Sequence, residues 1–271
     1  MTMPEAHPAH HKTVAIIQAR RASSRLPDKV LLDIGGEPML VRVVERTQQA
    51  KRVDAVVVAT TTDPSDEAIE ILCNARSYPC YRGSMHDVLD RYYQAARAVD
   101  AEVIVRITAD CPVIDPQVVD QTVQEFFAPR EGAGTPDSFV WNFAANRLPP
   151  PWGRTFPVGL DTEVCSFAGL EVAWKEASLP HQREHVMPFF YEHPERFRIL
   201  LVNAPGDYGA LRWTVDTAED LELLRQIYAR FAGKGNFSWL DVLALFEREP
   251  ELAKINAGVQ PKHYQQVDAR R

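Results

Sequence analysis

The chain has 271 residues, of which 45% are hydrophobic and 25% charged, and its formal net charge is −7. This length and composition fit a globular protein with one large core, to which a smaller lobe is added. The acidic charge argues against a protein that grips nucleic acid or anionic membranes through bulk electrostatics, so any anion-binding site must be local.

The cysteines and apolar runs indicate a cytoplasmic protein. The four cysteines form no C-x-x-C pair, which predicts reduced thiols. No apolar run reaches the roughly 18 residues of a membrane helix. Residues 1–12 lack the features of a signal peptide and are expected to form a disordered leader, in which His7, His10 and His11 bind no metal.

Short apolar runs alternate with helical patterns in the first half of the chain. Strands are predicted at residues 13–18, 55–60 and 102–107, and helices after Pro38, after a cap at Asp63 or Ser65, and over 86–99. This alternation predicts βαβ units on a largely parallel sheet, which is an α/β architecture. Ligands bind beyond the carboxyl ends of such strands, so the loops after Gln18, Thr60 and Ile107 are candidate sites.

The second half of the chain begins with a change of composition. Residues 128–157 turn to Pro, Gly, Asn and aromatic side chains, which predicts an excursion or inserted lobe. Further strands are expected at 159–165, 198–202 and 211–215. Ser166 and Thr217 are predicted to cap the helices that follow them, and residues 250–271 to form a helix remnant and a C-terminal tail.

The loop QARRASSRLPDK, residues 18–29, follows the first predicted strand and concentrates positive charge in an acidic chain. Its cations are Arg20, Arg21, Arg25 and Lys29. Arginine forks and a lysine ammonium suit the oxygens of a polyphosphate. The alternative is a solvated basic loop, in which Arg21 in particular would be surface.

Two aspartates follow predicted strands. Asp110 comes after 102–107 and Asp216 after 211–215. Together they could hold one Mg²⁺ from two sides, with phosphate and water completing its shell. Either aspartate alone could instead be a helix cap, because Asp115 and Thr217 indicate that helices begin nearby.

The basic loop, with the VLLDIGGEPML that follows it, resembles the signature of cytidylyltransferases that activate acidic sugars, the acylneuraminate and 3-deoxy-octulosonate enzymes. The spore-coat-polysaccharide branch is the closer likeness, through five segments in the same order: RGSMHDVLDRYYQAA, VIVRITADCPVIDP, GLDTEVCSF, REHVMPFFYEHPERF and RWTVDTAEDLELL. The resemblance implies a Rossmann-like α/β nucleotidyltransferase domain at 13–249 with a mostly parallel mixed sheet. It also implies a homodimer that uses CTP and Mg²⁺, with an acceptor and dimerisation lobe at about 128–200.

The resemblance also implies roles for individual residues. Asp110 and Asp216 would bind the metal, and Gln18 and Ala19 would lie against the base or ribose. An acceptor oxygen would attack the α-phosphorus, and pyrophosphate would leave under the charge of Lys29 and Arg25, the catalytic cations. The residues expected to bind the nucleotide are Gln18, Ala19, Arg20, Ser24, Arg25, Lys29, Arg106, Thr108 and Ala109. Ala22 departs from the family's usual Gly, and its methyl group is expected to reshape the loop or weaken phosphate binding.

Acceptor binding is assigned by the same resemblance to Asp161, Glu163, Arg183 and His185. Arg183 could pair an acceptor anion, and Asp161, also a candidate catalytic residue, could orient or deprotonate the attacking hydroxyl. Alternatively, Glu163 points outward from a strand and His185 is a core histidine.

Three functions remain open beside nucleotidyl transfer to an acidic sugar. They are transfer to a phosphate or phosphonate acceptor, glycosyl transfer from a nucleotide sugar, and sugar-nucleotide binding without turnover. A nicotinamide oxidoreductase is disfavoured, because ARRASS replaces the GxGxxG turn after the first strand.

Overall fold

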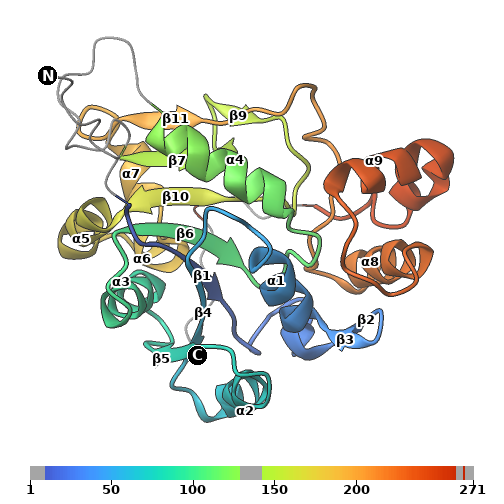
Figure 1. Cartoon of the computed structure of the whole chain (residues 1–271), viewed down its shortest axis with the longest axis horizontal. Helices are drawn as coiled ribbons and strands as arrows, with labels where there is room; N and C mark the ends of the chain where they lie inside the picture. Colours follow the sequence, from blue (N-terminus) through green and yellow to red (C-terminus); the bar gives the residue numbers. More distant parts are fainter. Residues whose placement is uncertain (1–9, 129–141, 261–264, 266–271) are drawn as a thin grey trace, which may run out of the picture.

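A seven-stranded sheet forms the centre of the computed structural model, which describes residues 10–128, 142–260 and 265 (Figure 1). In spatial order the strands are β11 (Ile199–Leu201), β7 (Phe143–Ala145), β10 (Glu163–Ser166), β6 (Val103–Thr108), β1 (Thr13–Gln18), β4 (Ala55–Thr61) and β5 (Cys80–Gly83). The strands β6, β1, β4 and β5 run parallel, and β10 is antiparallel to both of its neighbours. The sheet is therefore mixed and mostly parallel, as expected.

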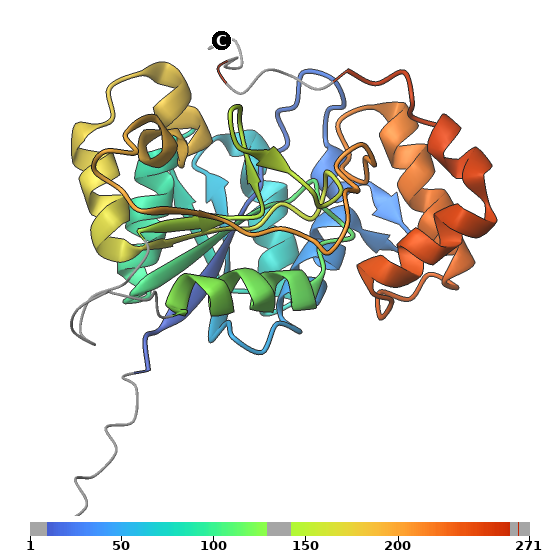
Figure 2. The same ribbon diagram turned by 90° about the horizontal axis from the view of Figure 1, so that it is seen from above.

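Helices cover both faces of this sheet (Figure 2). They are α1 (Met39–Thr47), α2 (Glu67–Ala75), α3 (Val88–Ala98), α4 (Pro116–Phe127), α5 (Phe167–Glu176), α6 (Pro180–His185), α7 (Pro188–Glu192), α8 (Ala218–Arg230) and α9 (Trp239–Arg248). Short 3-10 turns lie at η1 (Lys29–Leu31), η2 (Pro64–Asp66) and η3 (Pro250–Lys254), and two small ribbons pair β2 (Asp33–Ile34) with β3 (Glu37–Pro38) and β8 (Arg147–Leu148) with β9 (Gly153–Arg154). Among the described residues, none of the helices is long and apolar enough to cross a membrane.

The uninterrupted apolar run of β1 is explained by two cores. Ala15 and Ile17 pack into the core that includes α1, α4 and α8, whereas Val14 and Ile16 pack into the core that includes α3, α5 and α7. A strand covered on both faces needs apolar residues at every position rather than at alternate ones. The carboxyl end of β1, where the basic loop begins, is thereby fixed in the middle of the sheet.

The segment 128–200, expected as an inserted lobe, contributes β7, β10 and β11 to the central sheet. Strand β10 joins because its residues pair with β6 along four positions. The rest of the segment forms α5, α6, α7 and the ribbon β8–β9. Residues 129–141 lie outside the described part of the chain.

The strand predicted at 211–215 is wrong. Only an isolated bridge joins Arg212 to Val158, and the Val215 amide donates to the Asp110 carbonyl at 2.8 Å. Two backbone hydrogen bonds also join Val158 to Leu211 and Trp213, so the segment is held by two different loops rather than by one ladder. It nevertheless delivers Asp216 to the end of the sheet.

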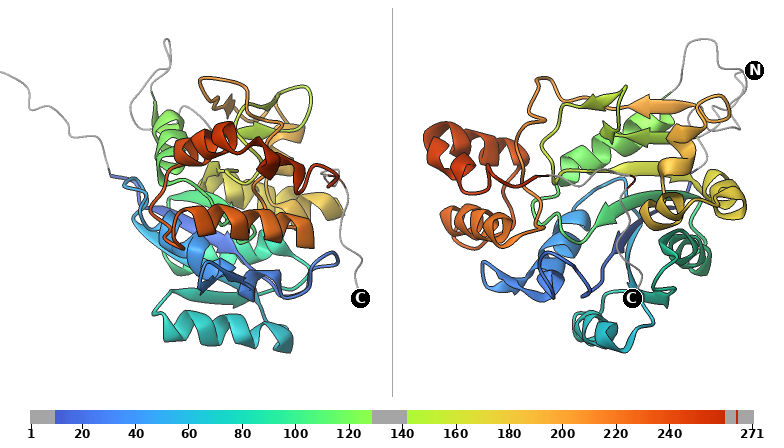
Figure 3. Two further views of the ribbon diagram at one scale, coloured as in Figure 1. Left: turned by 90° about the vertical axis from the view of Figure 1, so that its right-hand side faces the viewer. Right: turned by 180° about the vertical axis from the view of Figure 1, so that it is seen from behind.

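The two termini differ in how far they are described. The expected leader falls mostly on residues 1–9, which lie outside the described residues, as does His7. The expected tail begins with η3, where Leu252 is buried, and its residues 261–264 and 266–271 are not described. Helices α8 and α9 lie side by side at one end of the molecule, just before this turn (Figure 3).

Candidate active site

A cavity of about 310 Å³ opens at the carboxyl ends of β1 and β6. The loops predicted after Gln18 and Ile107 line it, whereas the one after Thr60 does not. Six cationic side chains line it: Arg20, Arg25, Lys29, Arg91, Arg106 and Arg147. Five carboxylates line it as well: Asp110, Asp161, Glu163, Glu184 and Asp216. Its charge is therefore +1, in a chain whose net charge is −7. The cavity therefore gathers positive charge locally, as the sequence analysis required of any anion-binding site in this acidic chain.

The basic loop is anchored by Asp66, a side chain only 2% exposed. One carboxylate oxygen accepts the Arg21 amide at 2.8 Å, and the other accepts the Thr61 hydroxyl at 2.5 Å. The Arg21 guanidinium donates to Asp28 and to the Ser65 carbonyl, and it does not line the cavity. Arg21 thus shapes the loop, while Arg20, Arg25 and Lys29 face the cavity.

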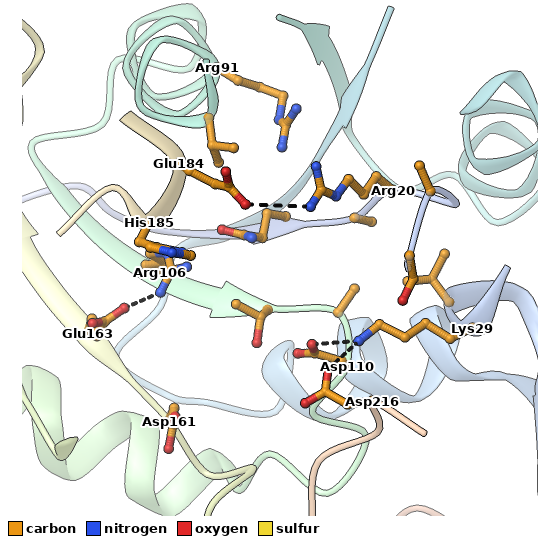
Figure 4. A pocket seen from close by; sticks show the side chains of 18 of the residues that line it. Arg20, Lys29, Arg91, Arg106, Asp110, Asp161, Glu163, Glu184, His185 and Asp216 are labelled. Carbon is orange, nitrogen blue, oxygen red and sulfur yellow. Dashed lines mark hydrogen bonds and ion pairs between the residues drawn. The ribbon is translucent and has the colours of Figure 1, made fainter. Parts of the chain in front are cut away.

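Lys29 lies between the two predicted metal ligands (Figure 4). Its Nζ donates to Asp110 Oδ2 at 2.9 Å, to Asp216 Oδ1 at 2.9 Å and to the Val215 carbonyl at 2.7 Å. Burial alone would lower the pKa of Lys29, but the two carboxylates outweigh it and raise that pKa. Side chains from positions 29, 110 and 216 therefore meet at one point, as the sequence predicts.

Asp216 is surrounded by cations. Besides Lys29, it accepts from Arg212 at 2.7 Å and from Arg25 at 2.9 Å. Burial tends to raise the pKa of Asp216, yet Lys29, Arg212 and Arg25 hold it at about 2. Asp216 is therefore ionised at neutral pH and paired with three cations.

Neither aspartate is a helix cap. Asp115 caps α4 by accepting the Gln117 amide at 2.8 Å, and Thr217 caps α8 by accepting the Asp220 amide at 3.3 Å. Asp110 and Asp216 are left to point into the cavity. The alternative explanation for this pair is thereby removed.

The pair fits Mg²⁺ by its chemistry. Within the described residues, no group of three or more His, Cys, Asp or Glu could hold a metal ion. Magnesium in nucleotide sites needs only one or two carboxylates, because phosphates and water supply the remaining oxygens. Asp110 and Asp216 offer two hard oxygens that converge on the Lys29 ammonium, so a cation already occupies the point they share.

The cations predicted for the triphosphate are each paired with a carboxylate. Arg20 lies 3.8 Å from Glu184, and Arg25 and Lys29 contact Asp216. A bound polyanion would compete with these carboxylates. The remaining predicted nucleotide-binding residues also line the cavity: Gln18, Ala19, Ser24, Arg106, Thr108 and Ala109. Ala22 lines it too, so its methyl group lies where the family's Gly would be.

The predicted acceptor residues separate into two groups. Glu163 pairs with Arg106 directly across β10 and β6, and it is 4% exposed, so the outward orientation considered for it is wrong. Asp161 accepts from both terminal nitrogens of Arg154, at 2.9 and 3.1 Å. Burial would raise the pKa of Asp161, but Arg154 and Arg147 lower it. Asp161, Glu163 and His185 all line the cavity.

Arg183 does not line the cavity. Its Nε lies 3.0 Å from both carboxylate oxygens of Asp87, and one terminal nitrogen donates to the Trp174 carbonyl at 2.7 Å. Asp87 is also the cap of α3. Arg183 thus ties α6 to α3, and this placement does not favour the predicted pairing with an acceptor anion.

Arg91, Arg147 and Tyr191 are among the cavity residues that the sequence analysis did not predict. A signal existed for Arg91, because it follows Val88 by three positions and precedes Ala95 by four, on the buried stripe of α3. Tyr92, its neighbour, is fully buried. Arg147 lies on β8, in the irregular segment whose conformation no periodicity predicts.

Comparisons with known proteins show what the whole chain is similar to. A family model described as cytidylyltransferase matches residues 14–231. An uncharacterised protein of Methanocaldococcus jannaschii is 34% identical over 95% of this chain and 99% of its own. The spore coat polysaccharide biosynthesis protein SpsF of Bacillus subtilis is 31% identical over 88% of this chain and 95% of its own. A cytidylyltransferase structure from Leptospira borgpetersenii superposes with a TM-score of 0.82 at 31% identity, covering 94% of this chain and all of that one.

Proposed function

Because the chain belongs to the cytidylyltransferase family, we propose that it transfers CMP from CTP to an acidic sugar, with Mg²⁺ and release of pyrophosphate. One observation carries the proposal. Lys29, Asp110 and Asp216 come from three distant parts of the sequence, and in the cavity the Lys29 Nζ lies 2.9 Å from a carboxylate oxygen of each aspartate.

In this reaction the protein positions the substrates and stabilises the negative charge on the phosphates. Arg20, Arg25 and Lys29 bind the triphosphate, and Lys29 and Arg25 offset the charge that develops on the leaving pyrophosphate. Asp110 and Asp216 would hold Mg²⁺, which when bound neutralises phosphate oxygens. Gln18 and Ala19, at the end of β1, lie against the nucleoside.

The acceptor is assigned to the side of the cavity lined by Asp161, Glu163 and His185. The low pKa of Asp161 keeps it ionised, so it can accept a hydrogen bond from the attacking hydroxyl. Arg106 is already paired with Glu163, and Arg147, which lies near Asp161, offers a cation to an acidic acceptor. The same charge would suit a phosphate or phosphonate, and the assay below includes both. The similarity to SpsF supports a place in polysaccharide biosynthesis.

We also propose a homodimer in the cytoplasm, as the family resemblance implies. The four cysteines are free, which agrees with a reducing compartment. Light scattering of the purified protein would measure its mass in solution, and a mass of one chain would contradict the dimer.

The deciding experiment measures pyrophosphate with each of the four nucleoside triphosphates, Mg²⁺ and a panel of acidic-sugar, phosphate and phosphonate acceptors. We expect a signal with CTP and an acidic sugar. Asp110→Asn should abolish it, whereas Asp100→Asn, the same change on the exposed surface, should not. Release of a nucleoside diphosphate from a nucleotide sugar would favour a glycosyltransferase, and CTP binding without pyrophosphate release would favour a binding protein.

A further inference from the structure

Arg91 is a buried cation at the cavity with hydrogen-bonding capacity left over. It is 1% exposed, one terminal nitrogen donates to the Ser84 carbonyl at 2.7 Å, and its Nε has no partner among the described residues. Arg46 shows the contrast. That arginine is equally buried but donates to the carbonyls of Ile114, Gly235 and Phe237. The fold supplies hydrogen-bond acceptors to the guanidinium of Arg46, whereas it leaves the Nε of Arg91 without one among the described residues.

The position of Arg91 is fixed by the sheet. The hydroxyl of its neighbour Tyr92 donates to the Ile16 and Ile107 carbonyls at 3.0 and 3.1 Å, which pins α3 over β1 and β6. A Cβ at Gly83 would lie 3.1 Å from Arg91 Cγ, so the side-chain stem is closely packed. Figure 4 shows the guanidinium extending from α3 toward Arg20 and Glu184, at the end of the cavity away from Lys29.

The charge of Arg91 is poorly compensated. Burial lowers its pKa to about 10, and nearby Arg20 acts in the same direction. No ion pair to a carboxylate is found for it among the residues described here, whereas Arg20, Arg25 and Lys29 each have one. A buried cation in this state stabilises a ligand that brings hydrogen-bond acceptors to it.

We propose that Arg91 donates to the acceptor edge of the cytosine base and selects CTP over UTP. This inference rests on the proposed function. Cytosine presents two adjacent acceptors, O2 and N3, which match the two donors of an arginine fork. Uracil carries a hydrogen on N3 and would face Arg91 donor to donor.

The placement favours the base over the phosphates as the partner of Arg91. Among the phosphate cations, Arg25 and Lys29 contact Asp216, whereas Arg20 lies near Arg91, so a triphosphate held by Arg25 and Lys29 would direct the nucleoside toward the end of the cavity where Arg91 lies (Figure 4). Gln18 also lines the cavity, and its buried Oε1 has no partner within the described residues. Its amide can accept the amino group of cytosine and complete the recognition of the base edge.

The test measures binding to the full-length protein by calorimetry, with CTP, UTP and inorganic tripolyphosphate as probes. Arg91→Met keeps the length of the side chain and removes its donors. We expect its affinity for CTP to fall about tenfold or more, its preference for CTP over UTP to disappear, and its affinity for tripolyphosphate to stay within about twofold. Because an uncompensated buried charge is removed, its thermal midpoint should rise by about 2–4 °C.

Arg91→Lys provides a second variant that keeps the charge but loses the fork. It should bind tripolyphosphate normally and discriminate poorly between CTP and UTP. Equal losses for CTP and tripolyphosphate in either variant would make Arg91 a phosphate ligand and overturn the inference, as would an unchanged preference for CTP. A wild-type protein that binds tripolyphosphate but does not prefer CTP would contradict the proposed function itself.

Discussion

At the scale of single residues, the ammonium of Lys29 stabilises the site, because without it the carboxylates of Asp110 and Asp216 would repel each other. Asp110 and Asp216 both accept from this one nitrogen. Of these two aspartates, Arg25 and Arg212 contact Asp216, so Lys29 is the cation paired with Asp110 among the described residues. Lys29 therefore has a structural role in the free protein and a catalytic role in the proposed reaction.

Lys29→Met should lower turnover about a hundred- to a thousandfold, because one preorganised charge is lost, while the protein stays folded. At neutral pH it should also lower the free energy of unfolding, by about 2 kcal/mol. Steady-state kinetics and urea denaturation measure the two effects. Lys29→Arg is the control that keeps the charge, and normal turnover in Lys29→Met would remove this residue from the mechanism.

The loss of stability should depend on pH in a defined direction. The folded-state pKa of Asp216 is about 2, below its ordinary value of 3.8. A depressed pKa contributes stability that is present above the ordinary value and is lost as pH falls through the folded one. The difference between wild type and Lys29→Met should therefore be full at pH 6 and shrink between pH 4 and pH 2. A constant difference over that range would show that Lys29 acts by packing alone.

At the scale of elements, the segment 211–216 places Asp216 beside Lys29 although it does not form a strand. Its close approach to the neighbouring loop depends on Gly159, whose φ is +108°. A Cβ there would lie 2.6 Å from the backbone carbonyl of Trp213. Any side chain must push the segment, and Asp216 with it, away from Lys29.

Gly159→Ala should therefore cost about 2–4 kcal/mol of stability and also raise the KM for CTP, because the displaced Asp216 no longer meets Lys29. Gly153→Ala is a matched control. Its φ is +111°, but a Cβ there meets nothing within 4 Å, so only the backbone strain of about 1–2 kcal/mol is expected. Equal effects of the two substitutions would show that the clash with Trp213 has no consequence.

The elements also show what the sequence can predict. Strand β1 and the caps Ser166 and Thr217 follow from local chemistry, and the structure confirms them. Strands β5 and β7 were missed because they are only four and three residues long, too short for a clear periodicity. The sequence placed Lys29, Asp110 and Asp216 at the ends of elements, whereas their shared contact depends on how those elements pack. Arg91 was missed because an arginine on an apolar helix face is read as an interruption rather than as a site.

At the scale of the whole molecule, the C-terminal turn, residues 250–258, supports the segment that carries Asp216. Asp220 is fully buried, and its carboxylate accepts the Asp216 amide at 2.9 Å and two bonds from Arg212. Asn256, far along the chain, donates to the same carboxylate at 2.8 Å and to the Arg212 carbonyl at 3.1 Å. The end of the described chain thus fixes the segment that carries Asp216.

Asn256→Ala should cost about 1–2 kcal/mol of unfolding free energy, since it leaves Asp220 with one donor fewer in a buried position. Asn256→Asp should cost more, because it places a second carboxylate against Asp220, and part of that cost should return as pH falls and one of the two is protonated. Lys254→Ala, at a side chain 72% exposed in the same turn, should leave stability within about 0.5 kcal/mol. Chemical denaturation at pH 7 and pH 5 separates these outcomes. If Asn256→Ala is as stable as wild type, the contacts of Asn256 with Asp220 and Arg212 do not stabilise the segment that carries Asp216.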